Sequence, residues 1–178
     1  MNSRSLVFAN IVLTLVCISV SGQTTCFDGD SYKLTEAGKK AFESLKNETT
    51  FALGGIGYGG EMSEGEEAMR VLLAEAHGSM ALYQLATTDA GAGGLYGMFG
   101  LRVIKSDCFS SAYKAFGELP DKGETSGRHE KLGASEVGHM SGCLYYVRKR
   151  KDIAGDIFRG KLDPWIKTIN RRIDVKTQ

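Results

Sequence analysis

The glycine-rich segment 54–60, Gly-Gly-Ile-Gly-Tyr-Gly-Gly, is the first place in this sequence where chemistry could be sited. Bare backbone amides ahead of a helix N-terminus can bind phosphate. A P-loop ends in Gly-Lys-Ser/Thr, whereas this segment continues Gly60-Glu61-Met62-Ser63. The dinucleotide-binding version needs a preceding strand, and residues 50–53 predict a poor one. The glutamates at 61, 64, 66 and 67 also outweigh the half positive charge of a helix N-terminus. We therefore interpret the segment as a turn that lets two helices approach.

Neither serine nor cysteine completes a nucleophilic site. The Gly-x-Ser-x-Gly spacing is met neither by residues 133–138 nor by 138–142. In an extended chain, the four-residue step from His139 to Cys143 covers roughly 13 Å, too far for a hydrogen bond. The same spacing would suit a metal, but no second close pair of Cys or His completes the ligand set. We expect no catalytic residue, metal or cofactor, and we expect His129 and His139 to be solvated.

The apolar run at 6–20 predicts the compartment. Arg4 precedes it and Ser21-Gly22 follow it, which is the layout of a secretory signal peptide. We expect cleavage after Gly22, and an uncleaved anchor is the alternative. Removal of residues 1–22 leaves 21 Lys and Arg against 21 Asp and Glu. This neutral balance argues against nucleic acid, or a membrane surface, as the partner of the mature chain.

Three cysteines remain after cleavage: Cys26, Cys108 and Cys143. The odd number allows one disulfide with a spare thiol, or three free thiols. We favour Cys108–Cys143, because we expect both near the core and expect Cys26 in a mobile terminus. Such a bridge would close a loop of about 35 residues and contribute roughly 3–4 kcal/mol.

The elements that must position these groups are short amphipathic helices. Apolar spacing and capping signals predict helices over 36–46, 63–77, 79–87, 90–104, 107–119, 152–158 and from 163 onward. Thr35, Ser63, Asp89, Asp107 and Asp163 are the predicted N-caps. The fold class is therefore mainly α: a single domain over 23–178, with a small strand or hairpin element near 126–148.

Two regions differ from this helical pattern. Residues 23–33 are predicted to be loose, and 120–141 to form an exposed loop or weak hairpin. Ser141 to Val147 is the best strand candidate because it is rich in β-formers. The basic tetrad 148–151 is interpreted as a solvated face.

The 90–104 helix carries five glycines, although each costs a helix interior roughly 1 kcal/mol relative to alanine. Gly93 and Gly97 lie one turn apart on one face. We expect a neighbouring helix to pack closely there and regain dispersion energy.

The segment Ala92-Gly93-Gly94-Leu95-Tyr96-Gly97-Met98-Phe99-Gly100-Leu101 and the late Ser141-Gly142-Cys143 resemble uncharacterised exported proteins of bacteria. The resemblance implies a periplasmic, envelope or extracellular protein and transfers no activity. Our first hypothesis is a non-enzymatic scaffold or protein-binding domain, with a protein partner or self-association. The alternatives are a small-ligand binder or hydrolase that uses 54–61 and 126–143, and an envelope protein held by an uncleaved N-terminus.

Overall fold

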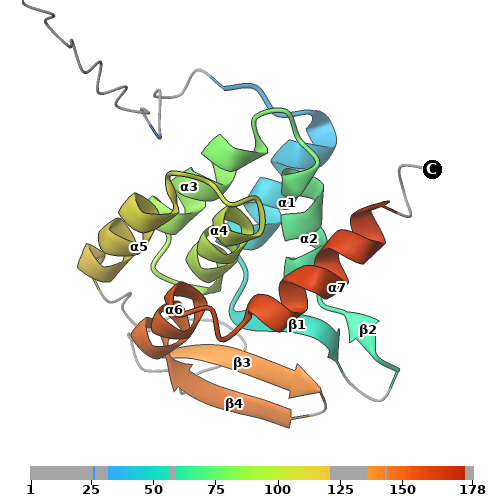
Figure 1. Cartoon of the computed structure of the whole chain (residues 1–178), viewed down its shortest axis with the longest axis vertical. Helices are drawn as coiled ribbons and strands as arrows, with labels where there is room; N and C mark the ends of the chain where they lie inside the picture. The colour runs from blue at the N-terminus through green and yellow to red at the C-terminus, as the bar shows by residue number, and fades with distance from the viewer. Residues whose placement is uncertain (1–25, 27–31, 57–58, 121–135, 143, 175–178) are drawn as a thin grey trace, which may run out of the picture.

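A four-stranded sheet and seven helices make up the part of the chain that the computed structural model describes, namely residues 26, 32–56, 59–120, 136–142 and 144–174. The helices are α1 (Glu36–Lys46), α2 (Glu64–Leu73), α3 (Gly78–Thr88), α4 (Ala92–Val103), α5 (Phe109–Glu118), α6 (Arg150–Phe158) and α7 (Asp163–Asp174). The strands are β1 (Thr50–Ile56), β2 (Glu61–Met62), β3 (Glu136–Gly142) and β4 (Leu144–Lys149), in the order β2-β1-β3-β4. The helices gather around α4, and the sheet lies along one side of them (Figure 1). The predicted class, a mainly α domain with a small strand element, is confirmed.

Two of the predicted N-caps begin helices as expected. The Thr35 hydroxyl accepts a hydrogen bond from Gly38 N at 3.1 Å, and the Ser63 hydroxyl accepts one from Glu66 N at 3.1 Å. Each bond satisfies one of the amides that a helix N-terminus leaves without an intrahelical partner. Local sequence therefore determines where α1 and α2 begin.

The predicted caps Asp89 and Asp107 are wrong, whereas α7 begins at Asp163, where its start was predicted. The N-cap of α4 is Gly91, whose amide donates to Asp89 Oδ1 at 2.8 Å, and α5 has no side-chain cap. Asp163 lies within the first turn of α7 and accepts a hydrogen bond from Arg102 Nη2 at 2.7 Å. A tertiary ion pair therefore engages Asp163 and ties α7 to α4.

Gly78 does not end the preceding helix as predicted, because α2 stops at Leu73 and Gly78 opens α3. A β-carbon at Gly78 would collide with the carbonyl oxygen of Leu72. The glycine lets α3 start directly against the last turn of α2.

Helix α4 is the central helix, as predicted, since every residue in it except Arg102 is buried. A β-carbon at Gly93 would collide with the carbonyl oxygen of Leu45, at the end of α1. A β-carbon at Gly97 would lie 2.5 Å from the carbonyl oxygen of Leu82, in α3. The predicted close approach at Gly93 and Gly97 is therefore confirmed, and the two neighbours are α1 and α3.

Strand β1 corrects the interpretation of the glycine-rich segment. Residues 50–56 form a strand whose Phe51 ring packs 4.8 Å from the ring of Tyr96 and is fully buried. The strand continues into a hairpin with β2, through the pairs Gly55↔Met62 and Ile56↔Glu61. The segment therefore joins two strands and is not a turn between two helices.

The predicted strand Ser141–Val147 is two strands. β3 and β4 pair antiparallel, with Ser141 opposite Leu144, so the chain reverses within the predicted run. β3 also pairs in parallel with β1, with Phe51 beside His139 and Ala52 beside Met140. Of the predicted loop, residues 121–135 lie outside the described residues, and 136–141 belong to β3.

The disulfide joins Cys26 to Cys108, with Cα atoms 5.4 Å apart, and this corrects the predicted Cys108–Cys143 pairing. Cys143 lies outside the described residues. We predicted a mobile Cys26 from its place near the terminus, but Cys26 lies beside α5, where Ser111 Oγ is 3.6 Å from its sulfur. A disulfide in this position fits an oxidising compartment.

Among the described residues, no helix combines the length and the apolar character that crossing a bilayer requires.

Candidate protein-binding surface

One of the two outer strands of the sheet, β4, carries four consecutive apolar residues that are exposed. Leu144, Tyr145, Tyr146 and Val147 are 60%, 42%, 44% and 48% exposed, and we call these four residues the β4 edge. Within the described part of the chain, β4 pairs with β3 alone, and Figure 1 shows it at the bottom of the sheet, on the side of β3 away from β1. An edge strand presents backbone donors and acceptors to another strand, and natural edges usually carry charges that discourage such pairing. The β4 edge has apolar residues instead.

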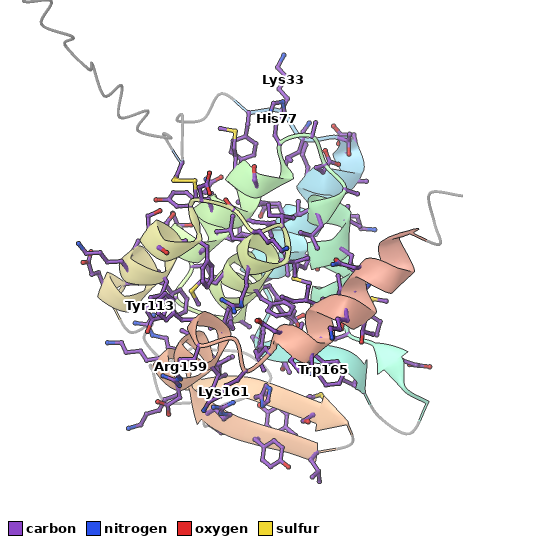
Figure 2. The ribbon with its side chains drawn as sticks, in the orientation of Figure 1. Lys33, His77, Tyr113, Arg159, Lys161 and Trp165 are labelled. Carbon is purple, nitrogen blue, oxygen red and sulfur yellow. A yellow bond between two sulfur atoms is a disulfide. The ribbon has the colours of Figure 1, made fainter. Side chains whose placement is uncertain are left out.

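The far end of β4 is tied to α6 by a cluster of charges. Asp156 accepts hydrogen bonds from Arg148 Nη2 at 2.7 Å and Arg159 Nη2 at 2.9 Å, and Lys161 Nζ lies 3.0 Å away. Burial raises the pKa of Asp156, but these three cations outweigh it and hold the pKa well below its usual range. Figure 2 shows Arg159 and Lys161 where α6 meets the sheet. The cluster fixes β4 against α6.

The basic tetrad is not the uniform solvated face that we predicted. Lys149 and Lys151 are exposed, as expected. Arg150 is 1% exposed, and its guanidinium donates to the carbonyl oxygen of Leu119 at 2.5 Å and lies 5.2 Å from the centre of the Phe116 ring. Arg150 therefore belongs to the core between α5 and α6, because the change from strand to helix at this residue turns its side chain inward.

His139 is half-buried, which corrects the prediction of a solvated side chain. Its ring is stacked 6.2 Å from that of Phe51 and lies 6.4 Å from that of Tyr146. Its Nδ1 atom is buried without a hydrogen-bond partner among the described residues. Burial lowers the pKa of His139, the charge of Arg148 lowers it further, and Asp156 opposes both. The neutral ring therefore joins the core to the β4 edge. His77 is exposed, and His129 lies outside the described residues.

The glycine-rich segment cannot offer its first amide to an external anion. Gly54 N donates to Glu66 Oε2 at 2.5 Å, and the other carboxylate oxygen accepts from Arg70 Nε at 2.9 Å. Gly54 has φ +80°, and a β-carbon there would collide with the ring of Trp165, which lies over β1 (Figure 2). An internal carboxylate therefore occupies the position that a phosphate would need.

A buried hydroxyl pair was missed by sequence reasoning. The Tyr96 hydroxyl accepts from Ala52 N at 2.9 Å and donates to Ala52 O at 2.8 Å, while Ser63 Oγ donates to the same carbonyl at 2.9 Å. Burial raises the pKa of Tyr96 above its ordinary range, so the hydroxyl stays protonated. Among the residues that the structure describes, β2 pairs only with Gly55 and Ile56. The side chains of Tyr96 and Ser63 bind the backbone of Ala52 instead. Ser63 had a capping signal, but nothing in the apolar α4 sequence indicated this role for Tyr96.

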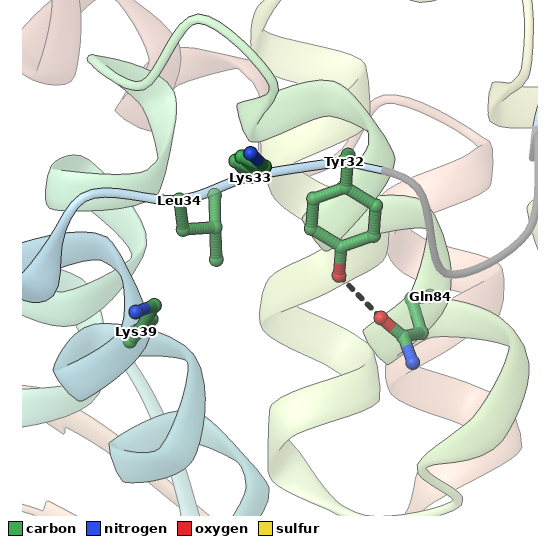
Figure 3. A pocket seen from close by; sticks show the side chains of 5 residues that line it. All are labelled: Tyr32, Lys33, Leu34, Lys39 and Gln84. Atoms are coloured by element: carbon green, nitrogen blue, oxygen red, sulfur yellow. Dashed lines mark hydrogen bonds between the residues drawn. The ribbon is translucent and has the colours of Figure 1, made fainter.

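Three surface hollows have volumes of about 430, 320 and 210 Å³. The largest of these three hollows is lined by described residues, namely Tyr32, Lys33, Leu34, Lys39 and Gln84 (Figure 3). The Tyr32 hydroxyl donates to the Gln84 side-chain oxygen, and Lys39 Nζ is paired with Glu36 at 2.7 Å. The alternative of a ligand-binding site shared by 54–61 and 126–143 requires the two segments to lie side by side, and β1 does pair with β3. Neither segment, however, lines any of these three hollows.

No known protein family, curated protein or solved structure matches this chain. Within the ranges that the structure describes, no three His, Cys, Asp or Glu side chains come together as metal ligands.

Proposed function

We propose that this chain is an exported bacterial protein whose folded domain is not an enzyme and binds another protein through the β4 edge. One observation carries the proposal. Four consecutive apolar residues are 42–60% exposed on the last strand of a sheet. Addition of a partner strand to such an edge is a recurring mode of protein recognition, in which backbone hydrogen bonds supply affinity and side chains supply specificity.

The chemistry of the buried polar groups supports a role without catalysis. Ser63 and Tyr96 both bond the backbone of Ala52, and Glu66 bonds Gly54 and Arg70. These groups are committed to holding β1 in place. A screen that found turnover abolished by one polar substitution, with the fold intact, would contradict this part of the proposal.

Export is supported by the layout of residues 4–22 and by the Cys26–Cys108 disulfide. The intact mass of protein recovered from the exported fraction tests it. A mass that begins at Gln23 and contains two thiols reactive only after reduction is expected. An uncleaved chain would instead favour the anchored envelope protein.

The binding surface is tested by placing a photo-crosslinking amino acid at Val147, in the β4 edge. The same group at Ile104, which is 42% exposed at the end of α4, is the matched control. Each protein is irradiated with the exported proteins of the producing organism, and adducts are identified by mass spectrometry. We expect a small set of defined adducts at Val147 that excess unlabelled wild-type protein abolishes.

Absence of adducts at Val147 would contradict the proposal. So would the same adducts from Val147 and Ile104, since these would report general surface stickiness. A turnover screen on the same preparations separates binding from catalysis.

Binding of a small ligand between the glycine-rich segment and β3 is the second candidate. It is favoured by the parallel pairing of β1 and β3, which brings the two segments side by side. A library of metabolites screened by NMR should then shift amide signals of 54–56 and 136–142 together. Shifts confined to the surface around Gln84 would point to the largest hollow instead.

A further inference from the structure

Strand β4 has an unequal distribution of charge along its length. Leu144 to Val147 are apolar, and the strand ends in the cations Arg148 and Lys149. Such a strand has two distinct ends, so the direction in which a partner strand pairs with it decides which groups meet.

We propose that the β4 edge binds a second copy of this chain, strand against strand and antiparallel, so that two four-stranded sheets join into one. This inference rests on the proposed protein-binding function and names its partner. Antiparallel pairing in the register that sets Leu144 opposite Val147 of the other copy brings the four apolar residues of one β4 against the four of the other. It also places Arg148 and Lys149 of the two copies at opposite ends of the pair. Parallel pairing in register would set the exposed Lys149 opposite Lys149 of the other copy, and like charges directly opposite each other are destabilising.

The overall charge of the chain also permits association of two copies. The formal net charge is +1 for the whole sequence, and it falls to zero when Arg4 is removed with residues 1–22. Proteins with net charge near zero lack the long-range repulsion that keeps highly charged chains apart. Nothing in the balance of charge therefore opposes the approach of two β4 edges.

The size of the contact determines how strong the dimer should be. β4 has six residues, and pairing covers its outer backbone and part of four apolar side chains. That is less than the roughly 800 Å² per partner of a standard stable interface. We expect a dimer that dissociates on dilution, with a dissociation constant in the micromolar range.

The test is sedimentation of the mature, disulfide-bonded protein over about 1 μM to 1 mM, which spans the expected dissociation constant. Val147→Lys replaces an apolar residue of the β4 edge by a cation, and Ile104→Lys makes the same change at a similarly exposed position outside the sheet. We expect wild type and Ile104→Lys to dimerise alike. Val147→Lys should raise the dissociation constant at least roughly tenfold. Circular dichroism confirms that each variant is folded, and Leu144→Lys replaces Val147→Lys if the latter is not.

A wild type that stays monomeric throughout this range would overturn the inference. A folded Val147→Lys or Leu144→Lys protein that dimerises like wild type would also overturn it, since the contact would then lie elsewhere. A monomeric protein that still gives specific adducts with other proteins at Val147 would retain the proposed function with a different partner. A monomer without such adducts would remove both.

Discussion

The hydroxyl pair on β1 makes a quantitative prediction about stability. Tyr96→Phe keeps the ring that packs against Phe51 but removes the oxygen that accepts from Ala52 N. A buried amide left without a partner costs about 1–3 kcal/mol, so we expect the free energy of unfolding to fall by about 2 kcal/mol. Ser63→Ala removes the N-cap of α2 and should cost about 1 kcal/mol.

The double variant distinguishes a shared network from two separate bonds. In each single variant, the carbonyl oxygen of Ala52 keeps one donor, either Ser63 Oγ or the Tyr96 hydroxyl. In the double variant this oxygen has lost both donors. The loss of unfolding free energy should therefore exceed the sum of the single losses by about 1 kcal/mol.

Urea denaturation followed by circular dichroism, with the disulfide intact, measures all three values. Tyr113→Phe is the control, because this ring is stacked 4.2 Å from that of Phe158 and is only partly buried. We expect it to change stability by less than about 0.5 kcal/mol. Additivity of the two single variants, or a Tyr96→Phe effect no larger than that of the control, would refute the argument.

Three other predictions follow from the packing, the disulfide and the charge cluster. In thermal melts, Gly97→Ala should destabilise the fold by roughly 2 kcal/mol because the added β-carbon would collide with α3. Gly117→Ala should stabilise the fold by about 0.5–1 kcal/mol, because a β-carbon there has nothing within 4 Å and alanine favours a helix. The opposite order of stabilities would contradict the described packing. Reduction should lower stability by about 4 kcal/mol, since the bridge spans 82 positions, and a non-reduced digest should link Cys26 to Cys108 and not to another cysteine. The pKa of Asp156 is lowered from 3.8 by folding, so its stabilisation is complete above that pH and is lost as the pH falls toward the depressed pKa. Asp156→Asn should therefore reduce the loss of unfolding free energy that the wild type shows as the pH falls below 3.8. The same loss in wild type and variant would show that the charge cluster does not contribute to stability.

The helices could be predicted because their signals are local. Thr35 and Ser63 bond amides three residues away, so each cap can be recognised in a short stretch of sequence. The glycines of α4 could also be interpreted, because a costly residue in an apolar helix indicates a close neighbour. The spacing of these glycines does not indicate that the neighbouring helices are α1 and α3.

The strands and the disulfide depend on contacts between distant parts of the chain. β1 contains Gly54 and Gly55, which weaken the strand signal, and the strand forms where Phe51 packs on α4 and pairs with β3. Cys26 is fixed by Cys108, against the usual mobility of a terminus. The composition of β4 indicated a strand, but its exposure follows from the strand order, which no local pattern specifies.

The parallel pairing of β1 with β3 has a consequence for the order of folding. Helices α2 to α5 lie between β1 and β3 in the sequence, so most of the helical part of the chain must be made before β1 can pair with β3. In an exported chain that emerges N-terminus first, Cys26 and Cys108 both reach the oxidising compartment before β3, so the bridge can close over the helices first. The sheet is completed afterwards, and β4 is the last strand to be added. The strand that we propose binds another chain is thus the last of the four strands to be made, and of the described elements only α6 and α7 follow it.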